Sequence, residues 1–587
     1  MLQQSEWMNG FLNQLVDWLE KAASNDLLNY DQGWEPMRND DFSGFMLYDI
    51  DKVLKAFIDQ NSNVLINAID YEERGNIIVT GSLCDSNKKK SSHALYILTE
   101  SIIDNYLPNF IVTMKDLCDY CVSIGISDIK SIIERNDKNY VSEDKLFVIL
   151  SVKRPANIIG SEQDIEFLHF VIQKDKHRKK KNRELKRIMP ECKVSMLTHI
   201  SERSQSLLKR LSGTQTEINE SKNIALIGCG SLGSKIGMHL TRNGNGPFLC
   251  IDDDIFMPHN NARHALTLTW AQNKAELLAL SMFSVSRVKA NAINKNAFNI
   301  DYADSRIIID TTASLSVRNF LMSKLELPPV ISGGLYNKGQ YGILFVENKT
   351  KTSTLSELWA FLYFQALENI ELRKILFSGQ ENHTQIGQSC SSQTMIVDDS
   401  KISLYASMMS LILQEILESS LPKHGNIYLF KYSTNYSLIT EVLSVPENVA
   451  VHTITEKEWQ VSLAKNVHEK MIELMNYKSP NETGGVLLGT VLLYAKKVVI
   501  TGLIPAPPDS IEKPNIFKLG TEGLEKNVKD IEKKTNGKVT YLGTWHSHPQ
   551  GGSASQTDNK TFKKLLFVRN YEPTVCLIVT PNEVLLV

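Results

Sequence analysis

The sequence has no uninterrupted apolar run near the roughly 20 residues that a membrane-spanning helix needs. Its first residues also lack the basic and apolar stretches of a secretory signal. A net charge of −2 gives no overall basic field that would attract nucleic acid. The eight cysteines show no paired spacing, which argues against a disulfide framework and indicates a reducing compartment. We therefore expect a cytoplasmic protein that has neither a membrane nor a nucleic acid as its partner.

The most informative segment is Gly-Thr-Trp-His-Ser-His-Pro at residues 543–549. Its first part is predicted to be a strand, on which residues two apart share a face, so His546 and His548 can hold one metal ion. Asp558 would complete the set from the start of a helix predicted over 560–568. Zinc with three protein ligands keeps a position for water and lowers the pKa of that water. Glu482, in a Glu-Thr-Gly-Gly segment, is then the candidate general base.

These motifs resemble the JAB/JAMM metalloproteases, the zinc isopeptidases that cut ubiquitin-like proteins from their conjugates. The resemblance implies that His546, His548 and Asp558 bind zinc and that Glu482 is the base. It also implies that Ser555, three residues before Asp558, polarises the scissile carbonyl. Nine residues separate His548 from Asp558, where the family usually has ten. A binding scaffold with an inactive zinc site therefore stays open as an alternative.

The middle of the chain has the pattern of a nucleotide site. A glycine-rich turn with Gly228, Gly230 and Gly233 lets the backbone approach phosphates, and the helix after it supplies oriented N–H groups. Asp252 follows nineteen residues after Gly233, a distance that suits a bond to a ribose hydroxyl. On its own, this pattern fits a dinucleotide cofactor as readily as ATP. The β-α-β unit is predicted as a strand over 223–227, a helix over 234–243 and a strand over 248–251.

The residues further along favour a nucleoside triphosphate. Arg263 and Lys274 can neutralise phosphate charge. The arrangement resembles the ThiF/MoeB/HesA superfamily, the adenylating domain of ubiquitin-activating enzymes, over roughly residues 225–314. That resemblance implies ATP binding by Asp252, Asn260, Arg263 and Lys274. Ala313 stands where the family often has an aspartate near magnesium, which leaves Asp254 and Asp310 as the candidate Mg²⁺ ligands.

The acceptor thiol of such an enzyme is predicted to be Cys390. It lies in a Gly/Ser/Gln-rich stretch over 379–400 that predicts a loop, and a largely apolar helix is predicted over 404–421. In the activating-enzyme family a crossover loop with the thioester cysteine often occupies this place. An unreactive loop thiol is the alternative. Cys576 is expected to be a core residue on an apolar strand.

The predicted fold class is α/β, with three domains. Residues 1–200 form an α+β domain of uncertain role, and parts of it resemble the region that follows a conjugating-enzyme domain, although that domain itself is not expected in this chain. Residues 201–446 form a Rossmann-like adenylating domain with a mainly parallel sheet, and residues 447–587 form an α/β JAMM metallopeptidase domain.

The predicted function is bifunctional: ATP-dependent activation of a ubiquitin-like protein through a thioester, and its zinc-dependent removal from conjugates. The resemblance implies a bacterial conjugation system, with antiphage defence as one role. The implied partners are the ubiquitin-like protein, a separate conjugating enzyme and a second copy of the chain, a homodimer formed through the adenylating domain. Activation of a sulfur carrier for metabolite biosynthesis, with the same adenylation chemistry, is the other alternative.

Overall fold

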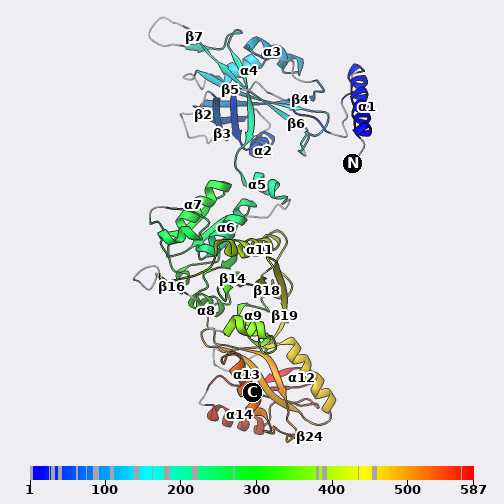
Figure 1. Ribbon diagram of the computed structural model, residues 1–587, viewed down its shortest axis with the longest axis vertical. Helices are drawn as coiled ribbons and strands as arrows, with labels where there is room; N and C mark the ends of the chain where they lie inside the picture. The colour runs from blue at the N-terminus through cyan, green and yellow to red at the C-terminus, as the bar shows by residue number, and fades with distance from the viewer. Residues whose placement is uncertain are drawn as a thin grey trace. The chain divides into compact units, whose positions relative to one another are not determined.

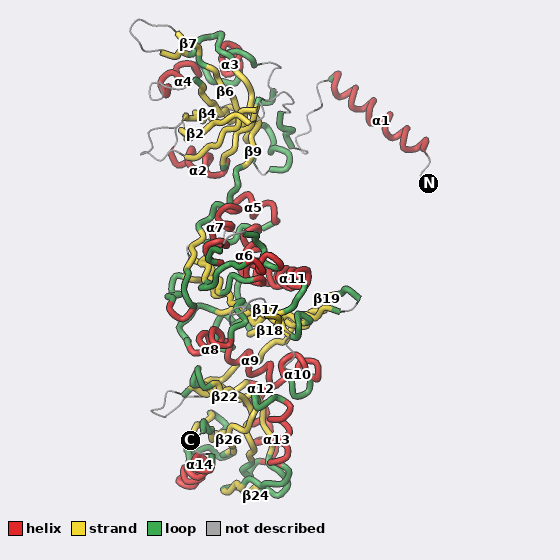
Figure 2. Tube along the Cα trace, turned by 60° about the vertical axis from the view of Figure 1, so that its left-hand side comes forward, coloured by secondary structure: helices red, strands yellow, loops and turns green. Residues whose placement is uncertain are grey.

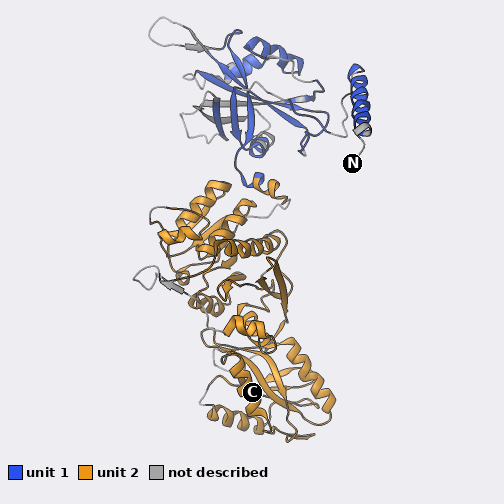
Figure 3. Ribbon diagram, viewed as in Figure 1, with its two compact units in different colours: residues 1–207 blue, residues 208–587 orange. Residues whose placement is uncertain are grey.

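The computed structural model (Figure 1) divides into two compact units, residues 1–207 and 208–587 (Figure 3). Cys390 and its immediate neighbours lie outside the described residues. Within the part of the chain that is described, no helix is both long and apolar enough to cross a bilayer. The described residues are 4–24, 27, 33–37, 43–60, 64–73, 76–83, 92–105, 111–137, 144–161, 163–177, 185–214, 222–268, 271–377, 383–385, 393–433, 435–451, 459–569 and 572–587.

Unit 1 is built on a closed barrel, so the predicted α+β domain has its sheet wrapped onto itself. The barrel closes because β1 pairs in parallel with both β3 and β9. A separate helix, α1 (Gln4–Ala23), precedes it. The barrel strands, in spatial order, are β1 (Gly44–Tyr48), β3 (Asn76–Leu83), β2 (Val64–Glu73), β4 (Ser92–Ile102), β5 (Lys145–Lys153), β6 (Ile165–Gln173) and β9 (Val194–Ser201). The other elements are α2 (Ile50–Gln60), α3 (Met114–Ser123), α4 (Ile129–Asp137) and the short pair β7 (Asp175–His177) and β8 (Leu185–Arg187).

Strand β5 explains how this unit buries two cores. It is apolar along nearly its whole length, and its interior residues are all buried. Because successive side chains point to opposite faces, Phe147 and Ile149 join the cluster that includes Val53 of α2. Leu146 and Val148 join the cluster formed with α3 and α4. A continuous apolar run is the expected pattern for a strand covered on both faces.

A buried ion pair fixes the Gly33–Met37 segment onto the barrel. The Arg154 guanidinium lies 2.6 Å from Glu166, and both side chains are almost fully buried. Trp34 Nε1 donates to the same carboxylate at 3.2 Å, and the guanidinium lies over the Trp34 ring. The Met37 backbone N–H donates to the other Glu166 oxygen at 2.6 Å. Since a buried charge needs partners for every lone pair, this network holds the segment in one position.

Unit 2 contains an eight-stranded sheet whose first five strands are parallel and whose last three are antiparallel. The parallel part matches the predicted Rossmann-like arrangement. Helices α6, α7 and α11 pack on one face, and α8 and α9 pack on the other. In order, the strands are β12 (Ala290–Ile293), β11 (Phe248–Ile251), β10 (Asn223–Ile227), β13 (Ser305–Asp310), β14 (Val330–Tyr336), β15 (Tyr341–Val346), β18 (Gly425–Tyr432) and β19 (Leu438–Val445). Helix α5 (Gln205–Ser212) contains the boundary between the two units, and the helices that follow are α6 (Ser231–Arg242), α7 (Lys274–Ser286), α8 (Leu315–Ser323), α9 (Leu355–Gln365), α10 (Ile370–Phe377) and α11 (Asp399–Glu418).

The same unit contains a second, seven-stranded sheet. Helix α12 covers one face of it, while α13 and α9 share a core with the other. The strands, in order, are β20 (Asn448–Val451), β21 (Gln460–Ala464), β23 (Lys497–Pro505), β22 (Gly484–Leu492), β26 (Thr540–Ser547), β27 (Val575–Val579) and β28 (Val584–Leu586). The helices are α12 (Lys465–Lys478), α13 (Leu524–Lys534) and α14 (Gln556–Val568).

Helix α9 lies between the two sheets of unit 2, as Figure 2 shows where it sits between β18 and β22. Its apolar residues point in every direction, the pattern of a helix buried on all sides. They share one core with Val486 and Leu488 of β22. One helix thus completes the hydrophobic core of both sheets.

A buried ion pair accompanies this packing. Glu357, in the first turn of α9, pairs with Lys497 of β23, and their side chains are 2% and 8% exposed. The Ser462 hydroxyl donates to Glu357 Oε1 at 2.7 Å. The second carboxylate oxygen closes the capping box with Thr354 at the helix start. The contact between the two halves of unit 2 is therefore both apolar and electrostatically specific.

Candidate functional site

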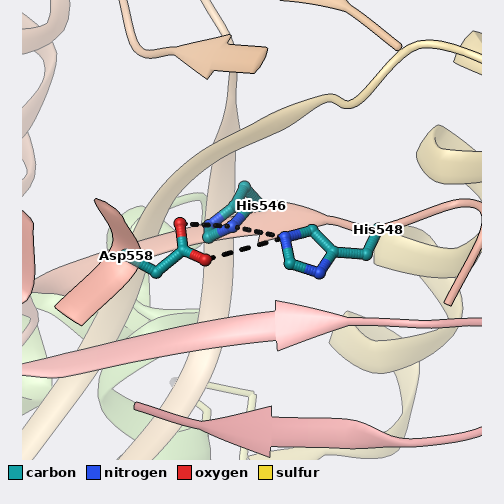
Figure 4. A group of neighbouring side chains, drawn as sticks. All are labelled: His546, His548 and Asp558. Atoms are coloured by element: carbon teal, nitrogen blue, oxygen red, sulfur yellow. Dashed lines mark hydrogen bonds and ion pairs between the residues drawn. The ribbon is translucent and has the colours of Figure 1, made fainter. Parts of the chain in front are cut away.

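The three predicted metal ligands converge on one point near the carboxyl end of β26 (Figure 4). His546 Nε2 lies 3.2 Å from His548 Nε2 and 3.3 Å from Asp558 Oδ1. His548 Nε2 lies 3.9 Å from Asp558 Oδ2. All three donor atoms lie within 4.8 Å of one another, and each side chain is partly buried. Two imidazoles and one carboxylate aimed at one point form a donor set that suits zinc.

The shortened loop after His548 still brings Asp558 to the two histidines. Gly551 and Gly552 have φ angles of 77° and 113°, which side chains rarely adopt. The Gly551 N–H donates to the His548 carbonyl at 2.9 Å, which turns the chain back. Helix α14 begins earlier than the predicted 560–568, so Asp558 lies in its first turn.

Ser555 and Asp558 form a capping box at the start of α14. The Asp558 N–H donates to Ser555 Oγ at 3.2 Å, and the Ser555 N–H donates to Asp558 Oδ2 at 2.7 Å. Burial would raise the pKa of Asp558, but hydrogen bonds from His546 and Ser555 hold it well below its usual range. The carboxylate is therefore fixed in place and charged, as a metal ligand must be.

Cys576 on β27 is a neighbour of His546 that the sequence did not reveal. It is buried, as expected for a core residue, and its thiol lies close enough to the His546 imidazole to raise the pKa of that ring. Burial alone would lower the pKa of His546, but Asp558 and Cys576 together raise it to about 9. Only the pairing of β26 with β27, which sets Cys576 opposite Thr544, could have indicated this contact.

Glu482 lies beside the three ligands. It comes two residues before Gly484, which pairs with His546 across β22 and β26. Burial raises the pKa of Glu482, and the nearby His546 lowers it in part. Thr483, which lies between Glu482 and Gly484, is also held in place, because its carbonyl accepts a hydrogen bond from the Ser547 N–H at 2.7 Å. A carboxylate with a raised pKa next to the metal position is suited to moving protons.

The glycine-rich turn occupies the end of β10, as the sequence predicts for a phosphate site. Gly228 has a φ of 87°, and Gly230 begins α6 with open space around its Cα. A side chain on Gly233 would collide with the Gly228 carbonyl and with Thr311, so only glycine fits there. The backbone of Gly230 is therefore open to a ligand at the helix N-terminus.

Several predicted nucleotide ligands surround this turn. Asp252 Oδ2 accepts the Cys229 N–H at 2.6 Å, and Oδ1 accepts the Asp254 N–H at 2.8 Å. Lys274 Nζ lies 2.8 Å from Asp254 Oδ2. Burial raises the pKa of Asp252. The turn, the two aspartates and Lys274 thus form one connected group at the carboxyl ends of β10 and β11.

The remaining predicted residues lie differently. Asn260 accepts the Met257 N–H at 2.7 Å through its side chain. The Arg263 guanidinium donates to the backbone carbonyl of Met395, on β17 (Gln393–Met395). Asp310 is 2% exposed, and its two oxygens accept hydrogen bonds from Thr312 and Ser332. Of the two candidate magnesium ligands, Asp254 is therefore the one that faces solvent.

Two family models match the chain. Residues 464–585 match the model described as prokaryotic homologs of the JAB domain. Residues 2–58 match the model of prokaryotic E2 family A. An E2-family segment is therefore present, which corrects the expectation that this chain contains no part of a conjugating-enzyme domain. Residues 2–58 contain no cysteine, so this segment does not supply the thiol of a conjugating enzyme.

Among curated proteins, a CD-NTase/cGAS isopeptidase of Enterobacter hormaechei subsp. hoffmannii (strain UCI 50) is 27% identical over 101 residues. The alignment covers 17% of this chain and 54% of that protein, so the chain spans about half the length of the relative it matches.

Among solved structures, E. coli MccB with succinimide has a TM-score of 0.28 at 15% identity, over 40% of this chain and 67% of MccB. E. coli MccB with AMPCPP and MccA has a TM-score of 0.27 at 16% identity, over 41% and 66%. The match of residues 464–585 confirms the JAB resemblance and covers every predicted zinc-site residue. The part of the chain that contains the glycine-rich turn at residues 228–233 and the eight-stranded sheet is the glycine-loop domain. The carboxyl-terminal part of this chain is thus a JAB domain, joined through the glycine-loop domain to an amino-terminal segment of prokaryotic E2 family A.

Proposed function

We propose that the JAB domain is a zinc-dependent isopeptidase that separates a ubiquitin-like protein from its conjugates. The convergence of His546, His548 and Asp558 beside Glu482 carries this proposal. Zinc held by these three ligands would supply a polarised carbonyl and a water of lowered pKa. Glu482 takes the proton from the attacking water and returns it to the leaving amine. Ser555 holds the scissile carbonyl through its hydroxyl, which its capping role leaves free to donate.

The relative named as a CD-NTase/cGAS isopeptidase supports a choice of conjugate. We propose that the substrate is a modifier joined by an isopeptide bond to a CD-NTase-type protein, within a bacterial defence system. The E2-family segment at residues 2–58 supports a partner role in the same conjugation system, with the conjugating cysteine on another chain. A homodimer through the glycine-loop domain belongs to the same proposal.

For the glycine-loop domain, we propose ATP-dependent adenylation of the same modifier. The modifier's terminal carboxylate attacks the α-phosphate, and pyrophosphate leaves as the acyl-adenylate forms. Asp252 would hold the ribose, the turn at Gly228, Gly230 and Gly233 would receive phosphates, and Lys274 would neutralise their charge. Asn260 and Arg263 complete the proposed ATP contacts, and Asp254, the candidate magnesium ligand that faces solvent, would hold Mg²⁺. Cys390 is the proposed acceptor thiol.

The isopeptidase assignment is tested by metal content together with cleavage. We expect the purified full chain to hold about one zinc ion, and His548→Ala to lose both the zinc and the activity. Metal is measured by plasma mass spectrometry. Cleavage is measured on a reporter protein fused to the carboxyl terminus of a ubiquitin-like protein. A wild-type protein without metal, or an His548→Ala variant that cleaves like wild type, would exclude the assignment and favour the scaffold alternative.

The adenylation assignment is tested by pyrophosphate exchange that depends on the modifier. Asp252→Ala removes a charged hydrogen-bond acceptor worth about 1.5–3 kcal/mol, so exchange is expected to fall by roughly 10- to 100-fold. Cleavage of the reporter fusion should stay at the wild-type level, because the Asp252 carboxylate accepts its hydrogen bonds from Cys229 and Asp254, beside the glycine-rich turn and not at the zinc site. Unchanged exchange would refute the ribose role. A thiocarboxylate product in place of a thioester on Cys390 would favour sulfur-carrier activation.

A further inference from the structure

A small hairpin stands beside the metal position. It consists of β24 (Ile511–Lys513) and β25 (Ile516–Lys518), joined by the turn Pro514-Asn515. Glu512 and Phe517 are direct cross-strand partners, so their side chains share a face. Both are partly buried, whereas Ile511 and Ile516 on the other face are 43% and 50% exposed. The hairpin therefore turns one polar and one aromatic side chain toward the domain.

That inner face is fastened to the residues around Glu482. The Glu482 N–H donates to the Lys513 carbonyl at 3.0 Å. The Thr483 hydroxyl donates to Glu512 Oε1 at 2.6 Å, and the other Glu512 oxygen pairs with Lys478 at the end of α12. The segment that contains the proposed base is thus bonded to the hairpin by two successive residues. Neither bond involves a metal ligand.

Phe517 adds a third contact, directly at the proposed base. Its backbone N–H faces the Glu482 carboxylate and lowers the pKa of that carboxyl in part, against the larger effect of burial. Its ring lies parallel to the His546 imidazole, with 6.3 Å between centroids and 13° between planes. The ring also fills the space above Gly484, where even a methyl group would collide with it. Phe517 therefore touches the base, the strand that follows the base, and the ring of one metal ligand.

We propose that the hairpin is a clamp for the general base, with Phe517 as the positioning residue that sets the Glu482 carboxylate against the metal position. This inference rests on the proposed isopeptidase function and names a residue of that same site. Glu482 precedes β22, so the sheet by itself does not fix its side chain. The Phe517 ring packs against Gly484 and so fixes the position of the hairpin. This packing orients the Phe517 N–H toward the Glu482 carboxylate. A displacement of about 1 Å at a reacting group can cost roughly 100-fold in rate.

The test compares Phe517→Ala with Ile516→Ala in the full chain. Ile516 is the matched control, because it is the neighbouring residue on the exposed face of the same strand. Three quantities are measured: zinc per chain, hydrogen exchange of the backbone amides at 482–484, and kcat and KM for the reporter fusion. For Phe517→Ala we expect full zinc, amide exchange faster by about 10-fold or more, and kcat lower by roughly 10- to 100-fold with KM unchanged. Phe517→Tyr should restore both exchange and kcat, since its ring fills the same space.

The outcomes separate the clamp from the function on which it rests. Wild-type amide exchange in Phe517→Ala overturns the clamp whether or not any fusion is cleaved. Loss of zinc in Phe517→Ala, with no change at 482–484, also overturns it, because the ring would then support His546 alone. If Phe517→Ala proves unstable, Phe517→Leu takes its place, with the melting temperature as the check on folding. Wild-type protein without zinc or cleavage refutes the proposed function, and the exchange result still decides whether the hairpin holds Glu482.

Discussion

Glu482→Gln is expected to abolish cleavage of the reporter fusion while leaving the zinc content at the wild-type level. The substitution keeps the size of the side chain and can still accept the Phe517 N–H, but an amide does not take up a proton. General base catalysis typically contributes about 10²- to 10⁴-fold, so kcat should fall by at least that range. KM should change little, because the amide occupies the same volume beside His546. The measurement is single-turnover cleavage with the metal content of the same sample.

The control for this variant is Glu525→Gln on α13. Glu525 is 81% exposed and pairs with Lys529, one turn further along the helix. It should retain wild-type zinc and wild-type cleavage. Equal cleavage by Glu482→Gln and the wild type would defeat the base assignment. Loss of zinc in Glu482→Gln would instead make Glu482 a metal ligand, a role that the three converging donors do not require.

Lys497→Met is expected to destabilise unit 2 by about 3–5 kcal/mol, the range for a buried ion pair that loses one partner. Glu357 would stay buried with its charge, supported only by the hydroxyl of Ser462 and the capping bonds at Thr354. The midpoint of urea unfolding should fall, and hydrogen exchange should quicken in both β23 and α9, because the pair joins these two elements. The matched control is Lys529→Met, whose ion pair with Glu525 is exposed, so the midpoint of urea unfolding should stay close to that of the wild type.

A double substitution distinguishes electrostatics from packing. Glu357→Gln combined with Lys497→Met removes both charges, so the loss should be smaller than the sum of the two single losses. Additive losses would show that the two side chains contribute to stability independently. A stability loss confined to β23, with α9 unaffected, would contradict the shared role of this contact.

The parts that sequence reasoning predicted well are those set by short-range patterns. The His546–His548 pair follows from strand alternation, and the glycine turn with Asp252 follows from fixed spacing within one β-α-β unit. The predicted helix over 234–243 and strand over 248–251 correspond to α6 and β11. In each case neighbours in the sequence determine the geometry.

The parts that it missed depend on contacts between distant segments. The barrel of unit 1 closes only when β1 meets β9, about 150 residues later. The contact of Cys576 with His546 requires the pairing of β26 with β27. Phe517 is far from Glu482 in the sequence, and no local pattern connects the two residues. The role of helix α9 was not predicted for the same reason. Its second apolar face packs against a sheet that starts about 100 residues further along the chain.

Helix α9 has a consequence for how the two halves of unit 2 are inherited. A recombination event that split the chain between β19 and β20 would leave each product with an uncovered apolar face and one half of an ion pair. Neither fragment would be a neutral starting point for selection. Because both halves lie on one chain, a cell holds them in a one-to-one ratio. The balance between their activities can therefore change only through the rate of each activity, not through the amount of each half.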